Sequence, residues 1–426
     1  MESTTVYLQA KPVPAADPGD GADLISGLAD NVLLRIVGLL PDARQVVRTG
    51  ALSRRWRGLW MRVSALRFDS GPRFQSPSDA ERFIAIVNHV IAPRAQPGIE
   101  QLGISMNVHY EPGEPHLAAA TVEAIERWVL YAVQHELTSF AFAVRVIEKN
   151  WLEDNDDHED EVAVEEEDNY YNGDKSDDEE EDEDEEEEDE EEEEYNYNID
   201  EGNDEKETPV TVIALDELPS STKLETLHLF LGGARVQLPS TSAIFPSLTD
   251  LSLKVIAVDN DHLSRFLSPA CCPCLQKLCL WAVRFDQASS KGLVLETSTL
   301  LELTMYSVDG MESLELRATN LRALDVECCD QLEQLTMSAS RLEQLTFSHN
   351  SSLDLEDGIQ LDLPCVRRLQ IGLVSHMLYD CDINDTSISL LKSCSSATCL
   401  VVDLEVPWVC VTLFRLSYRI VISGSI

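Results

Sequence analysis

The chain has 426 residues with 77 Asp and Glu against 32 Lys and Arg, so its formal net charge is −45 at pH 7. This balance argues against nucleic acid as the main ligand, because phosphate binding requires clustered lysine and arginine. With 44% hydrophobic residues the chain can still bury ordinary cores, over a length typical of roughly two to three domains.

The chain begins with a loose tail followed by three short helices. Residues 1–22 are rich in Pro, Ala, Gly and Asp and are expected to be disordered. Asn31–Leu40 predicts an amphipathic helix, because its apolar residues recur at helical spacing. Pro41 and Asp42 end this helix and start a second one, about 43–49, and a third begins near Ser53.

Two motifs in residues 23–67 carry a family resemblance. The segment LADNVLLRI begins at Leu28, and LSRRWRGLW runs from Leu52 to Trp60. Together they resemble the opening and closing motifs of an F-box, with Ala29 where Pro is usual and Asn31 where Asp is common. The resemblance implies a three-helix unit that docks onto a Skp-type adaptor, which in turn bridges to a cullin scaffold.

The small unit also has an excess of apolar side chains. A 45-residue unit cannot bury all of its large apolar groups, and exposed ones mark a binding face. Eight Arg against three Asp in residues 23–67 make it basic, which suits an acidic adaptor. The adaptor-binding residues expected are Leu28, Asp30, Leu33, Ile36, Leu40, Pro41, Leu52, Trp56 and Trp60, whereas Val37 and Val47 are expected in the core.

Residues 68–150 alternate between strand and helix patterns. The sequence predicts strands at 65–68, 99–106 and 137–147, and helices at 79–91 and 121–135. The alternation repeats every 35–40 residues or so, and we interpret it as the N-terminal part of a repeat domain.

Residues 151–208 differ from the rest in composition. Residues 153–207 hold 35 acids against Lys175 and Lys206, including 18 consecutive acids from Asp177 to Glu194. Such a self-repelling run predicts a disordered insertion rather than a catalytic site, since catalytic carboxylates need fixed environments. Two interpretations stay open: a solvated loop that aids solubility, and a tether for a basic partner protein.

The sequence becomes explicitly repetitive in residues 209–405. Ten frames of the form L-x-x-L-x-L begin at residues 224, 248, 275, 300, 311, 321, 332, 342, 366 and 397. They predict an α/β leucine-rich-repeat solenoid with parallel strands. Between 300 and 342 the frames recur every 10–11 residues, too close for a helix in each turn. We therefore expect each turn of the solenoid to hold two frames. Such a turn is about 21 residues long, near the short end of this repeat class, and its strands alternate between the concave and convex faces.

Beyond the repeats, residues 406–426 predict an atypical C-terminal strand or cap, since they leave the frame. The whole resembles plant F-box proteins with leucine-rich repeats, over about residues 23–405. That resemblance implies the substrate-recognition subunit of a cullin-type ubiquitin ligase, with an unknown protein target on the repeats.

Other functions find little support in the sequence. The N-terminus lacks a secretory pattern and no apolar stretch reaches bilayer length, so we expect a cytoplasmic or nuclear chain without a membrane partner. The 11 cysteines are expected as reduced thiols. The close group from Cys271 to Cys279 lacks the paired spacing of zinc sites, and no phosphate-loop or hydrolase motif occurs. We therefore expect neither enzyme activity, metal nor cofactor.

Target-binding residues are expected at the variable positions of the frames. They are Glu225, Thr226, His228, Thr249, Asp250, Ser252, Gln276, Lys277, Cys279, Glu302, Arg322, Glu333 and Glu343. Two alternatives stay open. The chain could be an acidic leucine-rich-repeat scaffold for basic proteins, which would need residues 153–207 and bind in a salt-sensitive manner. It could also carry an F-box that no longer docks, since Ala29 replaces a helix-starting proline.

Overall fold

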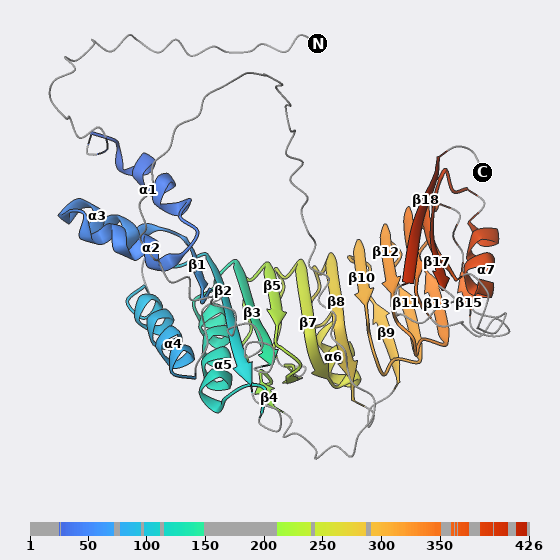
Figure 1. Ribbon diagram of the computed structural model, residues 1–426, viewed down its shortest axis with the longest axis horizontal. Coiled ribbons are helices and arrows are strands. Elements are labelled where there is room, and N and C mark those ends of the chain that lie inside the picture. The colour runs from blue at the N-terminus through green and yellow to red at the C-terminus, as the bar shows by residue number, and fades with distance from the viewer. Residues whose placement is uncertain are drawn as a thin grey trace, which may run out of the picture.

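The computed structural model describes residues 25, 27–71, 77–94, 98–110, 115–148, 211–239, 243–286, 291–350, 359–361, 363, 365–374, 384–394, 396–407 and 415–423. The expected tail (1–22) and acidic insertion (151–208) lie outside them. The described chain is a curved sheet with a small helical unit at its N-terminal end (Figure 1).

The structure contains the following helices and strands, in chain order. The helices are α1 Asp30–Gly38, α2 Ala43–Arg48, α3 Arg54–Leu59, α4 Pro77–Ile91, α5 Ala119–Gln134, α6 Asn260–Phe266 and α7 Asp385–Ser393. The strands are β1 Ala65–Asp69, β2 Gln101–Tyr110, β3 Ser139–Glu148, β4 Val212–Ala214, β5 Thr226–Phe230, β6 Arg235–Gln237, β7 Asp250–Val258, β8 Lys277–Phe285, β9 Gly292–Glu296, β10 Glu302–Tyr306, β11 Ser313–Arg317, β12 Ala323–Glu327, β13 Gln334–Ser338, β14 Gln344–Ser348, β15 Ile359–Leu361, β16 Arg368–Val374, β17 Cys399–Pro407 and β18 Arg415–Ser423.

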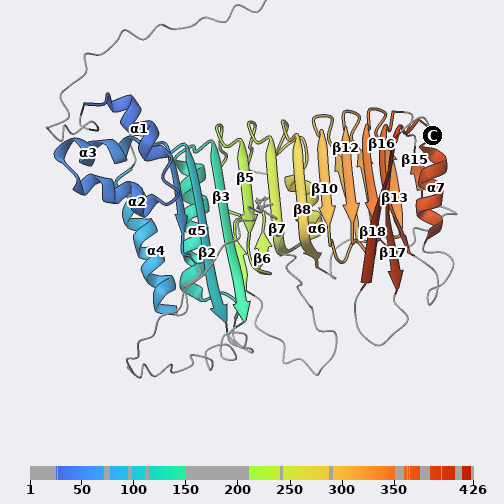
Figure 2. The same ribbon diagram turned by 45° about the horizontal axis from the view of Figure 1, so that its top comes forward.

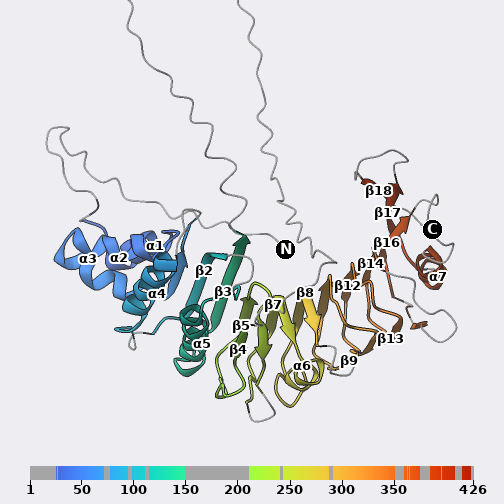
Figure 3. The ribbon, with the colours of Figure 1, turned by 60° about the horizontal axis from the view of Figure 1, so that its bottom comes forward.

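One 14-stranded sheet runs through the whole molecule. Its order is β1-β2-β3-β5-β7-β8-β10-β12-β14-β16-β17-β18; off this path, β6 pairs with β7 and β4 pairs with β6. All pairs along this path are parallel except the last, β17 with β18. The side-by-side strands are clearest in Figure 2. In Figure 3 the sheet lines the inside of an arc, and α5, α6 and the strands β9 and β13 lie on its outer side.

The repeat frames pack as the predicted solenoid. Their second leucines lie directly opposite one another on successive strands, so that they form one buried column. The column consists of Leu227, Leu251, Leu278, Leu303, Leu324, Leu345, Leu369 and Leu400. The α/β leucine-rich-repeat fold predicted from the sequence is thus the fold of the chain.

The back of the sheet changes along the chain. In residues 65–148, the helix-backed region, α4 and α5 cover the sheet, and Trp128 of α5 is fully buried. Residues 291–374 form the strand-backed region, where a second sheet of order β15-β13-β11-β9 replaces the helices. The predicted alternation of strands between two faces is therefore correct, but β9 was not among the expected frames.

The C-terminal end is a two-stranded hairpin edge. Strand β18 pairs antiparallel with β17, from Cys399 opposite Ser423 to Pro407 opposite Arg415. Asp403 of β17 is 7% exposed and accepts a 2.8 Å hydrogen bond from Nε of Arg419 on β18. The last strand is thus held by an ion pair between the exposed Arg419 and the buried Asp403. Within the described residues, no helix is long and apolar enough to cross a membrane.

Candidate adaptor and target-binding surfaces

Helix α1 is apolar on two sides. Leu33 and Val37 face inward and are fully buried, as the sequence predicts for Val37. On the other side Val32, Ile36 and Leu39 follow each other at i, i+4 and i+7 and are 40%, 44% and 83% exposed. A surface helix normally keeps its outer side polar, so this second stripe marks a contact surface.

Other apolar residues of the helical unit are exposed as well. Leu52 is 68% exposed, Ile25 is 55% exposed, and Pro41 is also exposed. We call Ile25, Val32, Ile36, Leu39 and Leu52 the apolar face of the F-box unit. Val32 and Ile36 belong to α1, Leu39 directly follows it, and the other two come from the segments before α1 and before α3. The sequence analysis included Ile36, Leu52 and Pro41, but missed Ile25, Val32 and Leu39, which a second helical period in α1 would have indicated.

Two of the expected adaptor-binding residues are corrected by the structure. Leu33 is completely buried and Trp56 is 8% exposed, so both belong to the core and cannot reach a partner. The three-helix core takes these large side chains because α1 packs against α3. Leu28, Leu40 and Trp60 are half-buried against the same core and contribute only their edges to the surface.

Asp30 is exposed, but its carboxylate is already bound. It accepts hydrogen bonds from Nε and Nη2 of Arg55 at 2.9 and 2.7 Å, and Arg62 lies 3.4 Å away. The hydrogen bond from Arg55 holds the pKa of Asp30 below its usual value. Arg55 also donates to the carbonyl oxygen of Leu28. These contacts fix the start of α1 relative to α3, which positions the apolar face.

Asp42 starts helix α2 and ties the unit to the sheet. Its carboxylate accepts from the backbone N of Arg44 at 2.6 Å and from Nη2 of the same residue at 2.8 Å. Burial by itself would raise the pKa of Asp42, but the hydrogen bonds from Arg44 outweigh it and lower the pKa. Arg44 in turn donates to the carbonyl of Asp69 at the end of β1.

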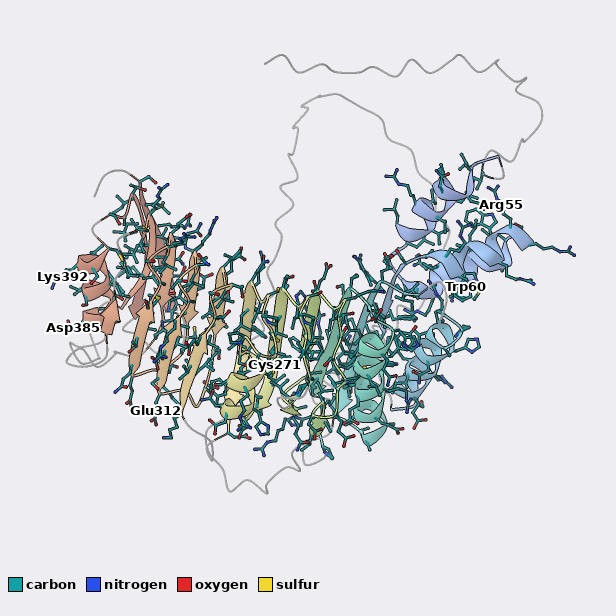
Figure 4. The ribbon with its side chains drawn as sticks, turned by 180° about the vertical axis from the view of Figure 1, so that it is seen from behind. Arg55, Trp60, Cys271, Glu312, Asp385 and Lys392 are labelled. Carbon is teal, nitrogen blue, oxygen red and sulfur yellow. The ribbon has the colours of Figure 1, made fainter. Side chains whose placement is uncertain are left out.

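A buried arginine joins the F-box unit to α4. Arg94 is 1% exposed, and its Nη1 donates to the carbonyl of Trp60 at 2.9 Å. Its guanidinium lies 5.7 Å from the centre of the Trp60 ring, within cation–π distance. Figure 4 shows Trp60 and Arg55 on the helical unit, at the opposite end of the molecule from Asp385 and Lys392 of α7. Trp60 is thus a structural residue at this junction.

Four of the expected target-binding residues gather on the concave sheet, as one hydrogen-bonded His–Asp pair and one ion pair. Nε2 of His228 on β5 lies 3.1 Å from Asp250 on β7, and Nζ of Lys277 on β8 lies 2.7 Å from Glu302 on β10. The hydrogen bond with Glu302 raises the pKa of Lys277. Such exposed pairs contribute little to stability, so their side chains can exchange partners when a ligand arrives.

Three other expected target-binding residues, Arg322, Glu333 and Glu343, lie elsewhere. Glu333 directly precedes β13, and its backbone N donates to the carbonyl of Glu312 before β11. Because β11 and β13 belong to the second sheet, Glu333 lies on the convex side and its expected place on the concave face is wrong. Arg322 and Glu343 precede β12 and β14 and lie at the edge where the concave strands begin.

An aromatic row on the concave face was missed from the sequence. Phe230, Trp281 and Tyr306 each follow the last apolar residue of a frame, and all three are half-buried. The rings of Trp281 and Tyr306 stack with centroids 5.9 Å apart, and Phe230 lies 6.2 Å from Trp281. Aligning the frames by this position would have found the row. Half-exposed Trp and Tyr are typical anchors of binding surfaces.

The cysteines pack as small apolar residues. Burial raises the pKa of the Cys272 and Cys329 thiols to about 12, so both stay protonated. Cys271, labelled in Figure 4, is also buried. Among the described residues no group of three or more His, Cys, Asp or Glu is arranged to hold a metal ion.

Known proteins match this chain in two ways. The family model for the leucine-rich repeats of an FBD-associated F-box protein matches residues 206–402. An FBD-associated F-box protein of Arabidopsis thaliana is 34% identical over 128 residues, which cover 30% of this chain and 27% of the relative. An F-box/FBD/LRR-repeat protein of the same plant is 48% identical over 62 residues, 15% of this chain and 13% of the relative.

The matches have limits in extent. The alignments with these two relatives span about a quarter or less of the relatives' own length. No solved structure matches the chain. Within the matched regions, the chain resembles the plant F-box proteins with leucine-rich repeats, as its F-box motifs and repeat frames predict.

Proposed function

We propose that this chain is the substrate-recognition subunit of a cullin-type ubiquitin ligase. Its F-box unit docks onto a Skp-type adaptor, and its repeats hold a protein target in the cytoplasm or nucleus. The observation that carries this proposal is the apolar face of the F-box unit, where Leu39 and Leu52 are 83% and 68% exposed. Side chains of this size stay exposed in a folded unit when a partner covers them.

The charge of the unit supports the same partner. Residues 23–67 contain eight Arg and three Asp within a chain of net charge −45. Arg55 and Arg62 lie against Asp30, whereas the side chains of Arg35, Arg48 and Arg57 make no hydrogen bond or ion pair within the described residues. A locally basic surface steers association with an acidic adaptor.

In this role the chain contributes position rather than chemistry. A target held on the repeats remains at a high effective concentration near the ubiquitin-loaded subunit. The aromatic row of Phe230, Trp281 and Tyr306 supplies rigid apolar area on the concave face. The His228–Asp250 pair and the Lys277–Glu302 ion pair lie on the same sheet and provide polar contacts.

The test is capture of a purified Skp-type adaptor by the full chain. The variant Leu39→Ala/Leu52→Ala removes two exposed side chains and should leave the fold intact. Burying one leucine is worth about 1.5–3 kcal/mol, so we expect affinity to fall by more than about tenfold. The matched control is Ile244→Ala/Ile388→Ala, which removes two exposed apolar side chains outside the unit. Equal capture by both variants and the wild type would refute docking through this face.

The replacement of the usual proline by Ala29 is tested separately. Ala29 precedes α1 with φ −67° and makes no side-chain capping bond, and this φ is the one that proline imposes. Ala29→Pro should therefore strengthen the unit by about 0.4–1 kcal/mol and leave adaptor capture at least as strong. Restoration of capture from nothing by this change would instead identify the natural F-box as non-docking.

The alternative proposal is an acidic scaffold for basic proteins, which the 35 acids of residues 153–207 favour. Deleting residues 153–207 should abolish capture of a basic protein such as a histone, whereas Leu39→Ala/Leu52→Ala should not affect it. Binding through these acids should also weaken steeply as salt rises. If the deletion leaves histone capture unchanged and the apolar-face variant loses the adaptor, the ligase proposal stands alone.

A further inference from the structure

A pocket of about 590 Å³ lies at the edge where the last concave strands begin. It is lined mainly by Arg322, Arg341, Glu343, Arg367, Ser396 and Thr398, which precede β12, β14, β16 and β17. Three guanidinium groups thus surround one cavity, with a single carboxylate among them. Such a cluster is unusual in a chain whose net charge is −45.

Hydrogen bonds between the strand starts fix the spacing of these residues. The backbone N of Glu343 donates to the carbonyl of Arg322, and that of Arg367 donates to the carbonyl of Glu343, both at 2.8 Å. Thr398 continues the series by donating to Arg367 at 2.8 Å. Neighbouring strands are about 4.8 Å apart, so Arg322 and Arg367 stand roughly 10 Å apart on either side of Glu343.

The two outer arginines are unpaired among the described residues. Some other cations of the solenoid have carboxylate partners: Lys277 lies 2.7 Å from Glu302, and Arg235 lies 2.6 Å from Asp286. Neither Arg322 nor Arg367 has a side-chain hydrogen bond or ion pair with any described residue, even though Glu343 lies between them. A ligand therefore meets these guanidinium groups without displacing an existing partner.

The third arginine and the hydroxyls complete the donor set. Nη1 of Arg341 donates to Oδ1 of Asn320 at 2.8 Å. Its other N–H groups make no side-chain hydrogen bond with a described residue and can bind a ligand. The hydroxyls of Ser396 and Thr398 donate to the carbonyls of Val366 and Arg367, at 3.0 and 3.4 Å. The free donors of the pocket are therefore guanidinium groups, which bind oxyanions through two parallel hydrogen bonds.

The charge of the pocket selects among oxyanions. Three arginines and one glutamate leave a net charge of +2, which matches a phosphate monoester of about −1.5 to −2 rather than a single carboxylate. We propose that this arginine pocket binds a phosphate monoester group. On the proposed function, the natural source is a phosphorylated serine or threonine of the protein target. A free phosphorylated small molecule carries the same group, and the experiment distinguishes the two.

The test uses the full chain without adaptor and fluorescent degenerate peptides. One peptide library has a central phosphoserine, and two others have serine or glutamate there. The phosphoserine library should bind at least about tenfold more tightly than either, since hydrogen bonds between ionised groups are stronger than those between neutral groups. Orthophosphate and O-phosphoserine serve as competitors. If they displace the peptide only at concentrations far above the peptide's, the source is a phosphorylated target; if they compete equally well, it is a small molecule.

Variants decide whether this pocket is responsible. Arg322→Ala/Arg367→Ala should lower phosphopeptide affinity by tenfold or more, and Glu343→Gln should raise it. The matched control is Arg48→Ala/Arg67→Ala, which removes the same charge from two exposed arginines on α2 and β1. If the control and the pocket variant lose the same affinity, the effect is one of net charge and the proposed site is wrong. The site is also wrong if the serine or glutamate library binds as tightly as the phosphoserine library.

Failure of this inference is distinguishable from failure of the proposed function. Adaptor capture depends on Leu39 and Leu52, at the other end of the molecule from the pocket. If the chain captures the adaptor but does not bind the phosphopeptides, only the proposed phosphate pocket is refuted. A chain that binds phosphopeptides but captures no adaptor refutes the ligase proposal alone.

Discussion

The helix-backed and strand-backed regions share one sheet but differ in what supports it. In the helix-backed region Ala65 lies opposite Gln101 and Gln101 opposite Ser139, so a long segment separates each strand from the next. In the strand-backed region Glu302 lies opposite Ala323 and Ala323 opposite Gln344, and this step along the chain is little more than half as long. The length of the repeat therefore sets the element on the convex side.

The reason is the length that a return path needs. A long step leaves enough residues for a full crossover helix between parallel strands, such as the 15 residues of α4 or the 16 of α5. The shorter step holds two five-residue strands and the tight turns between them, as β10 and β11 show. The short repeat thus covers its convex side with a second sheet.

The largest expected effect lies in the helix-backed region. Trp128 on α5 is fully buried, contacts Phe142 with ring centroids 5.8 Å apart, and donates to Oδ1 of Asn88 at 2.8 Å. Trp128→Ala should lower the free energy of unfolding by about 3–5 kcal/mol, measured by urea denaturation. Asn88→Ala, which leaves only the indole N–H without a partner, should cost about 1–3 kcal/mol. A cost for Trp128→Ala below that of Asn88→Ala would contradict a core built on this ring.

A leucine of the second sheet tests the other region. Leu335 of β13 is fully buried and lies opposite Leu314 of β11. Leu335→Ala should cost about 2–5 kcal/mol. Because repeats contact mainly their neighbours, hydrogen exchange should rise in β11 and β13 while β2 keeps its protection. Uniform loss of protection over both regions would mean that the solenoid unfolds as one unit.

Much of this comparison could be predicted from the sequence. The spacing of the frames predicted the alternation of faces between residues 300 and 342, because a large apolar residue, most often leucine, at every core position makes the period visible. Strand β9 was missed because the residues that lead from Leu280 to β9 do not form a complete repeat frame. The expected place of Glu333 on the concave face failed for a related reason, since the same frame occurs on both sheets and only the pairing assigns the face.

The backbone of the concave sheet was less predictable. Five residues of the concave sheet have a positive φ, between 47° and 54°, although they are not glycines. Each lies two residues after the last apolar position of its frame. They are Val255, Ala282, Ser307, Cys328 and His349. Local preferences would place Gly or Asn there, so tertiary packing of the repeat imposes this conformation. The prediction of the candidate surfaces was limited in the same way. The sequence does not show that Leu33 of α1 is buried whereas Leu39, which directly follows α1, is exposed.

A glycine near the start of the strand-backed region gives a prediction with a smaller expected change in stability. Gly310 has φ +79°, and a Cβ there would lie 2.8 Å from the carbonyl oxygen of Phe285. Gly310→Ala should therefore destabilise the chain by more than about 1 kcal/mol. Gly58→Ala is the matched control, because its Cβ would meet nothing within 4 Å in α3, and it should stabilise by up to about 1 kcal/mol. Thermal unfolding measures both, and equal effects would show that the tight turn has room to spare.

The smallest effect concerns the charges on the concave face of the strand-backed region. Burial, with Asp325 and Asp403 as like charges, raises the pKa of Glu327 above its usual value, although His349 and Ser348 act in the opposite direction. The folded chain thus binds this proton more tightly than the unfolded chain, and stability falls as the pH rises from about 4.5 through the raised pKa. Glu327→Gln removes the charge, so it should stabilise the chain at pH 7.

Its expected gain is below about 1 kcal/mol, as for like charges on one face of a sheet, and it should vanish below about pH 4, where the carboxyl is protonated. In the F-box unit Asp42 has the opposite sign, since Arg44 lowers its pKa and its contribution is lost on acidification. Asp42→Asn should therefore destabilise at pH 7 and less so in acid. Chemical denaturation from about pH 2 to 8 compares the two variants, because the contribution of Asp42 is lost only below its usual pKa of 3.8. A loss of stability at pH 7 in Glu327→Gln would mean that its contacts with His349 and Ser348 outweigh the repulsion, and that this crowded face is held together by Glu327 rather than strained by it.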